Sequence, residues 1–196
     1  PRSLSARILS PVLAGADRLV ANSHYTASRV KEAHPHLGPI HVCPLALIPD
    51  DVSASATAGE ATVPSLGPHA VLVVGRMAAT ERYKGHDQLI DAWPQVIDAV
   101  PDARLVIVGD GDDAPRLREK AAASRASGAI VFTGFVAKAT LEALYERAAL
   151  FALPSRGEGF GLVYLEAMAH RLSCIGSIHD AAREVIVDNV TGRLVD

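Results

Sequence analysis

The sequence has 196 residues, of which 49% are hydrophobic and 21% charged, and this balance is typical of a folded globular domain rather than a disordered chain. The net charge is −3 and lysines and arginines form no block, so we do not expect nucleic acid as a partner. The apolar runs are too short for a transmembrane helix.

The first part of the chain predicts a short α/β segment. Apolar spacing predicts a helix over 4–14, with Pro11 as a kink or break, followed by a buried strand over 16–23. Ser23 is expected to cap a helix that extends to about Ala33, and a second strand is predicted over 40–47. Residues 49–69 are rich in Ser, Thr, Ala, Gly and Pro and predict a linker.

A regular alternation of strands and helices begins at residue 70. Strands are predicted at 70–75, 103–109, 129–134, 149–155 and 172–176, helices at 86–99, 114–124, 138–148 and 161–170, and a last strand at the closing GRLV. Strands that are apolar on both faces indicate a parallel sheet covered by helices on each side. We therefore predict a doubly wound, Rossmann-like α/β domain, in which ligands bind at the carboxyl ends of the strands.

Two cationic side chains follow the first of these strands. Gly75 and Arg76 end the strand, and Lys84 comes just before the next helix. An anion between the two cations would gain about 4 kcal/mol per contact at an effective dielectric near 20, before desolvation costs. The alternative is that Arg76 and Lys84 are solvated loop charges.

A glycine-rich turn follows the fourth strand of this region. Gly157, Gly159 and Gly161 alternate across it, and the amides of the helix that begins there favour an anion. Glu158 and Glu166 lie in the turn and in the helix, where a carboxylate facing the ligand could accept hydrogen bonds from vicinal hydroxyls. Alternatively, Glu158 interacts with the helix dipole and Glu166 faces solvent.

Other sequence patterns can be signs of a dinucleotide, nucleoside triphosphate or metal site. Gly109, Gly111 and Ala114 form G-x-G-x-x-A after a strand, but the next strand ends without the carboxylate that a dinucleotide site requires, so NAD is not expected. No G-K-[S/T] phosphate loop occurs, and the histidines at 34, 36 and 41 lack regular metal-site spacing, which predicts a surface cluster. The turn at 133–136 could meet a flat base or be an ordinary turn. Cys43 and Cys174 are expected to be free, buried thiols in a reducing cytosol.

The motifs GRM…KGH, VGDG, TGFV and PSRGEGFGLVYLEAMA, in this order, resemble the retaining, nucleotide-sugar-dependent family-four (group 1) glycosyltransferases, which have the two Rossmann-like domains of the GT-B fold. The resemblance covers about 70–196, including EVI…TGRLV. DRLVANSHYTASRV and VCPLAL resemble the end of that family's acceptor-side domain. The family resemblance implies that residues 1–48 are the edge of the acceptor-side domain and that residues 70–196 are a donor-binding domain truncated at its C-terminus. The rest of the acceptor-side domain would then be missing.

The resemblance also implies roles for individual residues. Arg76 and Lys84 would hold the donor diphosphate, Glu158 the sugar hydroxyls and Glu166 the ribose hydroxyls, and the backbone of Val136 would meet the base. The remaining donor-binding positions implied are Gly75 and the amides near Gly159, Phe160, Gly161 and Leu162. Arg76, Lys84 and Glu158 would be the catalytic residues, because they act on the charge of the leaving group or on the sugar.

The implied reaction is transfer of a hexose, with retention, from a UDP- or GDP-sugar to a glycan or lipid-linked acceptor, without a metal or other cofactor. Polysaccharide or glycolipid biosynthesis in the cytoplasm is the expected setting, with peripheral contact to the inner membrane face through the absent domain. This chain alone would be the donor-binding part and inactive. The alternative is a non-catalytic subunit or domain that binds nucleotide sugars.

The sequence departs from the family pattern at two places. Residues 170–174 (HRLSC) stand where the family has a small or glycine-containing turn and a proline. Ile178, His179 and Asp180 stand in place of a glycine pair. Both departures lie near the predicted sugar site, and neither changes the donor-binding motifs.

Overall fold

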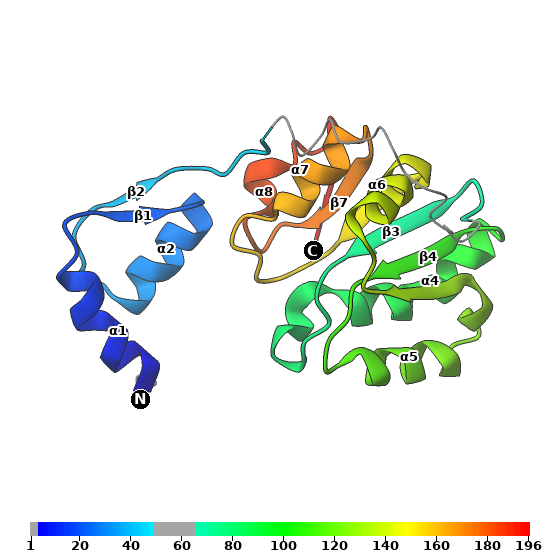
Figure 1. Cartoon of the computed structure of the whole chain (residues 1–196), viewed down its shortest axis with the longest axis horizontal. Coiled ribbons are helices and arrows are strands. Elements are labelled where there is room, and N and C mark those ends of the chain that lie inside the picture. The colour runs from blue at the N-terminus through cyan, green and yellow to red at the C-terminus, as the bar shows by residue number, and fades with distance from the viewer. Residues whose placement is uncertain (1–3, 49–65) are drawn as a thin grey trace.

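The computed structural model describes residues 4–48 and 66–196, and the first of these ranges forms a small α/β unit (Figure 1). Helix α1 (Leu4–Ala14) continues through Pro11. Strands β1 (Leu19–Ala21) and β2 (Ile40–Val42) pair in parallel, and α2 (His24–Ala33) connects them along the chain. The predicted cap is present, because Ser23 Oγ accepts a hydrogen bond from the Thr26 amide at 2.9 Å. Both predicted strands are shorter than expected, and the predicted linker lies outside the described residues except for its last four positions, 66–69.

The second range forms a six-stranded sheet in which every pairing is parallel. Its strands are β3 (Ala70–Val74), β4 (Arg104–Val108), β5 (Ile130–Gly134), β6 (Leu150–Leu153), β7 (Ser173–Ser177) and β8 (Gly192–Val195). They lie in the order β5-β4-β3-β6-β7-β8. The predicted doubly wound, Rossmann-like fold is confirmed.

Helices cover both faces of this sheet. Figure 1 shows α4 (His86–Ala99) and α5 (Ala114–Ala123) on one face, and α6 (Lys138–Arg147), α7 (Leu162–Ala169) and α8 (Ala182–Val185) on the other. The sequence predicted the four longer helices, but not α8 or the 3-10 helices η1 (Ala79–Lys84) and η2 (Ser127–Ala129). The inner strands β3, β4, β6 and β7 are largely buried, as their continuous apolar runs predicted, whereas the edge strands β5 and β8 are mostly half-buried or exposed. The largest buried strand residues are Leu72, Val73, Leu105, Val106, Ile107 and Phe151.

The order of the strands fixes where a ligand can bind. Successive strands after β3 are added toward one edge of the sheet and those after β6 toward the other, so the direction of winding changes between β3 and β6. In open parallel sheets this switch point opens a crevice at the carboxyl ends of the strands. The loops that follow β3 and β6 therefore form the walls of the candidate site.

The loop after β3 is held against its neighbours on two sides. Gly85 has φ 87°, and a Cβ there would lie 2.7 Å from the carbonyl oxygen of Pro154, so only glycine permits this contact with the loop after β6. On the other side, the buried carboxylate of Asp113 accepts hydrogen bonds from Arg82 in η1 and from Arg116 in α5. The pKa of Asp113 is lowered to about 2, mainly by the hydrogen bonds from Arg116.

The small unit contacts the large one through the start of α2. The hydroxyls of Ser23 and Thr26 both donate to the carbonyl oxygen of Gly159, at 2.5 and 2.9 Å. The carboxylate of Glu184 in α8 accepts from the amides of His24 and Tyr25, at 2.8 and 2.7 Å. The start of α2 is thus fixed to the glycine-rich turn after β6.

Two expectations about cysteine and histidine burial were wrong in part. Cys174 is buried, and burial raises the pKa of its thiol to about 12, whereas Cys43, which follows β2, is exposed. Of the expected surface histidines, His34 is buried at the end of α2, where its ring contacts Ser10 Oγ at 3.1 Å. In the described ranges, no helix combines the length and the apolar character needed to cross a bilayer.

Candidate functional site

A hollow of about 430 Å³ lies at the carboxyl ends of β3 and β6, and we call it the switch-point hollow. Its lining comes from the loops after both strands, from α7 and from the small unit. The residues are Asn22, Leu45, Val74, Gly75, Lys84, Leu153, Glu158, Gly159, Phe160, Gly161, Leu162, Val163 and Glu166. Eight of these thirteen are predicted site residues, so motifs that are up to about ninety positions apart in the sequence meet here.

A second hollow of about 410 Å³, the side hollow, adjoins the first and shares Val74 and Gly75 with it. Arg76 and Val136 line this side hollow and not the switch-point hollow. Phe135, whose side chain is 86% exposed, lies beside Val136 on its rim. The predicted site residues therefore divide between two adjacent hollows, with Gly75 at their junction.

The two predicted cations share one carboxylate, Glu81, which the sequence analysis missed. Arg76 donates to Glu81 through Nε and Nη2, and Lys84 Nζ lies 3.5 Å from Glu81 Oε2. The hydrogen bond from Arg76 is the main reason that the pKa of Glu81 is lowered. Both cations therefore lie on the same flank of the site, although only the side chain of Lys84 is enclosed, at 16% exposure against 68% for Arg76.

Glu158 projects into the switch-point hollow from a turn that a buried carboxylate fixes. Its Oε1 lies 3.4 Å from Lys84 Nζ and has no hydrogen-bond partner within the described ranges. Its amide donates to Asp180 Oδ2 at 2.9 Å, and the amide of Ala182 donates to Asp180 Oδ1 at 2.9 Å. Asp180 is fully buried, and this burial raises its pKa. One of the departures from the family pattern therefore supplies the residue that holds the Glu158 turn.

Glu166 is held by a tyrosine that the sequence did not single out. The hydroxyl of Tyr145 donates to Glu166 Oε2 at 3.1 Å, and the Tyr145 ring stacks on His170 with centroids 5.3 Å apart. Burial, together with the charge of Glu166, raises the pKa of Tyr145 well above its usual range, so it remains a donor. Glu166 is half-buried and lines the hollow, with one carboxylate oxygen bonded to Tyr145.

The glycine-rich turn brings the start of α7 to the hollow. Gly161 has φ 84°, and a Cβ there would lie 2.5 Å from the ring of Tyr164, whose hydroxyl donates to the Leu153 carbonyl at 2.6 Å. The first amides of a helix have no intrahelical acceptor, and Leu162 and Val163 line the hollow at this end. The turn therefore directs the positive end of the α7 dipole toward the switch-point hollow.

The G-x-G-x-x-A sequence has a structural explanation. A Cβ on Gly109 or Gly111 would lie 2.1 Å from the carbonyl oxygen of Gly75 or Met77 respectively. Both glycines have positive φ, and the two turns are joined by backbone hydrogen bonds such as Met77 N to Asp110 O at 2.9 Å. These glycines allow the loops after β3 and β4 to pack together, which accounts for the pattern without a dinucleotide.

His86 lies beneath the junction of the two hollows. Its Nε2 would be 3.8 Å from a Cβ placed on Gly75, and this nitrogen has no hydrogen-bond partner in the described part of the chain. Burial, with a smaller contribution from Lys84, lowers the pKa of His86 to about 4. The imidazole is therefore neutral near pH 7.

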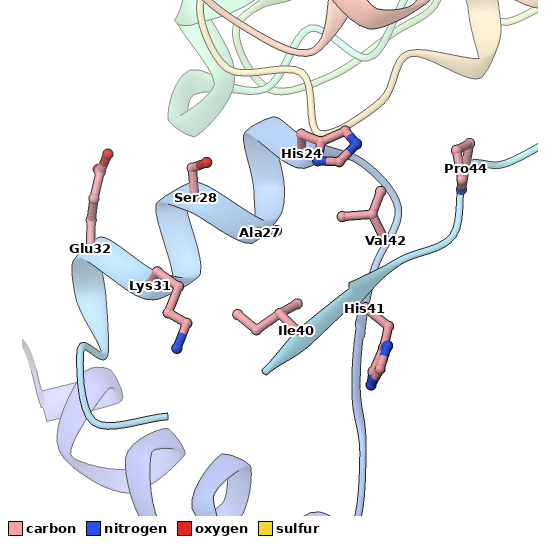
Figure 2. A pocket seen from close by; sticks show the side chains of 9 residues that line it. All are labelled: His24, Ala27, Ser28, Lys31, Glu32, Ile40, His41, Val42 and Pro44. Carbon is pink, nitrogen blue, oxygen red and sulfur yellow. The ribbon is translucent and has the colours of Figure 1, made fainter. Parts of the chain in front are cut away.

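Another hollow, of about 720 Å³, lies in the small unit between α2 and β2. Figure 2 shows Ile40 and Val42 directed toward α2, while His41 is on the other side of the strand. None of the predicted site residues lines it. Over residues 4–48 and 66–196, no group of three or more His, Cys, Asp or Glu side chains is placed to hold a metal ion.

Comparison with known proteins places these motifs in a family. The family model described as Glycosyl transferases group 1 matches residues 68–196. Phosphatidyl-myo-inositol mannosyltransferase of Mycobacterium tuberculosis is 39% identical over 126 residues, which are 64% of this chain and 32% of that protein. GDP-mannose-dependent alpha-(1-6)-phosphatidylinositol monomannoside mannosyltransferase of Mycolicibacterium smegmatis is 36% identical over 120 residues, 58% of this chain and 31% of that protein. The match thus spans about a third of these relatives.

Solved structures agree in fold. The C-terminal domain of the group 1 glycosyl transferase LpcC from Francisella tularensis superimposes with a TM-score of 0.57 and 29% identity, covering 65% of this chain and 67% of that one. The Anabaena protein HepE, crystallised with UDP and glucose, gives a TM-score of 0.75 at 22% identity and covers 97% of this chain and 52% of its own. The second match spans both the small unit and the large sheet, and at this identity it establishes the fold alone.

Proposed function

Because the chain belongs to the group 1 glycosyl transferases, we propose that its two adjacent hollows bind a nucleoside diphosphate sugar as the donor of a hexose. The observation that carries the proposal is that Lys84, Glu158, Glu166 and the start of α7 meet in the switch-point hollow. This arrangement offers a cation and helix amides to an anion, and carboxylates to hydroxyls, within one cavity.

Each part of the donor has a matching group in this geometry. Lys84 and Arg76 bind the diphosphate, together with the amides at the start of α7. Glu166, oriented by Tyr145, accepts hydrogen bonds from the ribose hydroxyls, and Glu158 accepts them from the sugar. The base lies in the side hollow beside the backbone of Val136.

The proposed reaction is a retaining transfer without a metal ion. The acceptor hydroxyl oxygen forms a bond to the anomeric carbon on the face from which the diphosphate departs. The bond between that carbon and the phosphate oxygen breaks, and its electron pair leaves with the diphosphate, which takes the proton of the hydroxyl. Lys84, Arg76 and the α7 amides stabilise the charge that grows on the leaving group, which is where fixed charges lower the barrier most.

We further propose GDP-mannose as the donor and a lipid-linked glycan or glycolipid as the acceptor, in a cytoplasmic pathway at the membrane surface. The support is that the mannosyltransferase relatives are named for phosphatidyl-myo-inositol and for GDP-mannose. The HepE structure contains UDP and glucose, so UDP-glucose is the alternative donor to compare with GDP-mannose.

A thermal shift experiment tests the proposal. GDP-mannose, GDP, UDP-glucose and UDP are added separately to the chain, in magnesium and in EDTA, and the melting temperature is measured. We expect one nucleotide pair to raise the melting temperature in a concentration-dependent way in both buffers, because a ligand that binds only the folded state stabilises it. No shift with any of the four would refute donor binding, and a shift that requires magnesium would refute the metal-independent diphosphate site.

A further inference from the structure

Asn22 is a residue of the small unit that lines the switch-point hollow of the large one. It follows β1 directly and shares the hollow with Glu158 and Gly159. Its Oδ1 is buried and, over the residues that the structure describes, has no hydrogen-bond partner. Buried polar atoms are nearly always paired, so an unpaired acceptor at the wall of a cavity indicates a ligand that donates to it.

The position of Asn22 is set by the contact between the two units. Ser23 and Thr26 both donate to the carbonyl oxygen of Gly159. A Cβ on Gly159 would lie 3.7 Å from Asn22 Nδ2 and 3.9 Å from Oδ1, so the amide group packs against the glycine that follows Glu158. The carboxamide is therefore held beside the Glu158 turn and needs no rearrangement to act with it.

The chemistry of the amide selects one part of the proposed donor. An amide oxygen accepts hydrogen bonds, and a fully ionised diphosphate has no proton to donate to it, whereas a sugar hydroxyl does. Lys84, which attracts the diphosphate, lies beside Glu158, 3.4 Å from its carboxylate. The hexose is thus the donor group that fits between Asn22 and Glu158.

We propose that Asn22 is a binding residue for the transferred hexose, with its carboxamide hydrogen-bonded to a sugar hydroxyl and Ser23 and Thr26 acting as positioning residues. This inference rests on the proposed function. It adds that the small unit contributes to the donor sugar site, so that the bound sugar contacts both units.

Calorimetry with matched ligands tests the proposal. Asn22→Leu keeps the approximate size of the side chain and removes its hydrogen bonds. We expect GDP-mannose, or UDP-glucose if that is the preferred donor, to bind about tenfold more weakly, as for one lost hydrogen bond. The corresponding diphosphate, GDP or UDP, should bind as it does to the unaltered chain. Gln95→Leu, which removes an exposed amide from α4, is the control and should change neither affinity.

Three outcomes would overturn the inference. An equal loss of affinity for the nucleotide sugar and for the diphosphate would mean that Asn22 acts on the fold or on the phosphate. Unchanged affinity for both ligands would mean that Asn22 does not contact the sugar. A second test needs no substitution, because deoxy-hexose donors should bind the unaltered chain more weakly when the hydroxyl facing Asn22 is missing. A deoxy series with uniform affinity would contradict the proposal. If the unaltered chain bound none of the nucleotides, the proposed function itself would fail.

Discussion

Removal of the Lys84 ammonium tests the diphosphate site directly. Lys84→Met keeps the aliphatic stem of a side chain that is 16% exposed and removes only the charge. Among the described residues, the ammonium forms ion pairs with two carboxylates, Glu158 Oε1 at 3.4 Å and Glu81 Oε2 at 3.5 Å. The variant therefore leaves two half-buried carboxylates without their shared cation, and a bound diphosphate would meet their negative charge directly.

The size of the effect follows from these distances. At an effective dielectric near 20, one unit charge at 3.4 Å contributes about 5 kcal/mol, and a phosphate oxygen at a similar distance gains as much before desolvation. Desolvation and the competing carboxylates cancel a large part of this. We expect a net loss of about 3 kcal/mol, which is a diphosphate affinity roughly a hundredfold weaker.

Calorimetry with a nucleoside diphosphate and with the phosphate-free nucleoside separates the alternatives. Binding of the diphosphate should fall by this factor, while binding of the nucleoside should be unchanged. Arg82→Met is the control, because Arg82 is in the same 3-10 helix but pairs with Asp113 outside the hollows. Equal losses for the two ligands, or equal effects of the two variants, would refute a diphosphate role for Lys84.

Three further predictions concern other parts of the site. In competition binding, Glu166→Ala should lower the affinity for ribonucleotides about tenfold more than the affinity for their deoxyribose analogues. An equal loss of affinity for both kinds of nucleotide would exclude contact with the ribose. His86 has a pKa near 4 in the folded chain and about 6.5 in the unfolded chain. Between pH 4 and pH 6.5, its imidazole is therefore more protonated in the unfolded chain than in the folded one. The free energy of unfolding should then fall by up to about 3 kcal/mol from pH 6.5 to 4 in urea titrations, and His86→Gln should remove that part of the slope. Gly161→Ala should destabilise the fold by about 2 kcal/mol, through positive φ and the Tyr164 contact, whereas Gly128→Ala, which meets nothing within 4 Å, should not.

The sequence was sufficient to predict the sheet and that several candidate site residues would lie together at one edge of it. The strands of the large unit are continuous apolar runs, and such runs arise when both faces of a parallel sheet are covered. Since parallel strands end at one edge, the motifs after β3 and β6 were expected to meet, and Lys84, Glu158 and Glu166 do line one hollow. Their roles toward a ligand remain predictions.

The residues that hold the site were not predictable in the same way. Asp180 and Tyr145 bond to Glu158 and Glu166 across 22 and 21 positions of sequence, and no local spacing links either pair. Glu81 was overlooked because η1 is too short to give a periodic pattern. Asn22 lies in a different unit altogether, and its place at the hollow depends on how the two units pack.

The charges of the site also indicate why a sugar-linked diphosphate would suit it better than a free one. Arg76, Lys84, Glu81 and Glu158 balance one another, so an added diphosphate makes the group negative and is repelled by Glu158. A ligand that also brings hydroxyls can donate to that carboxylate and offset the repulsion. Pyrophosphate has no such hydroxyls, and we therefore expect it to bind more weakly than either a nucleoside diphosphate or its sugar. On this reasoning Glu158→Gln should narrow the difference between pyrophosphate and the nucleotide sugar, by tightening the first and loosening the second.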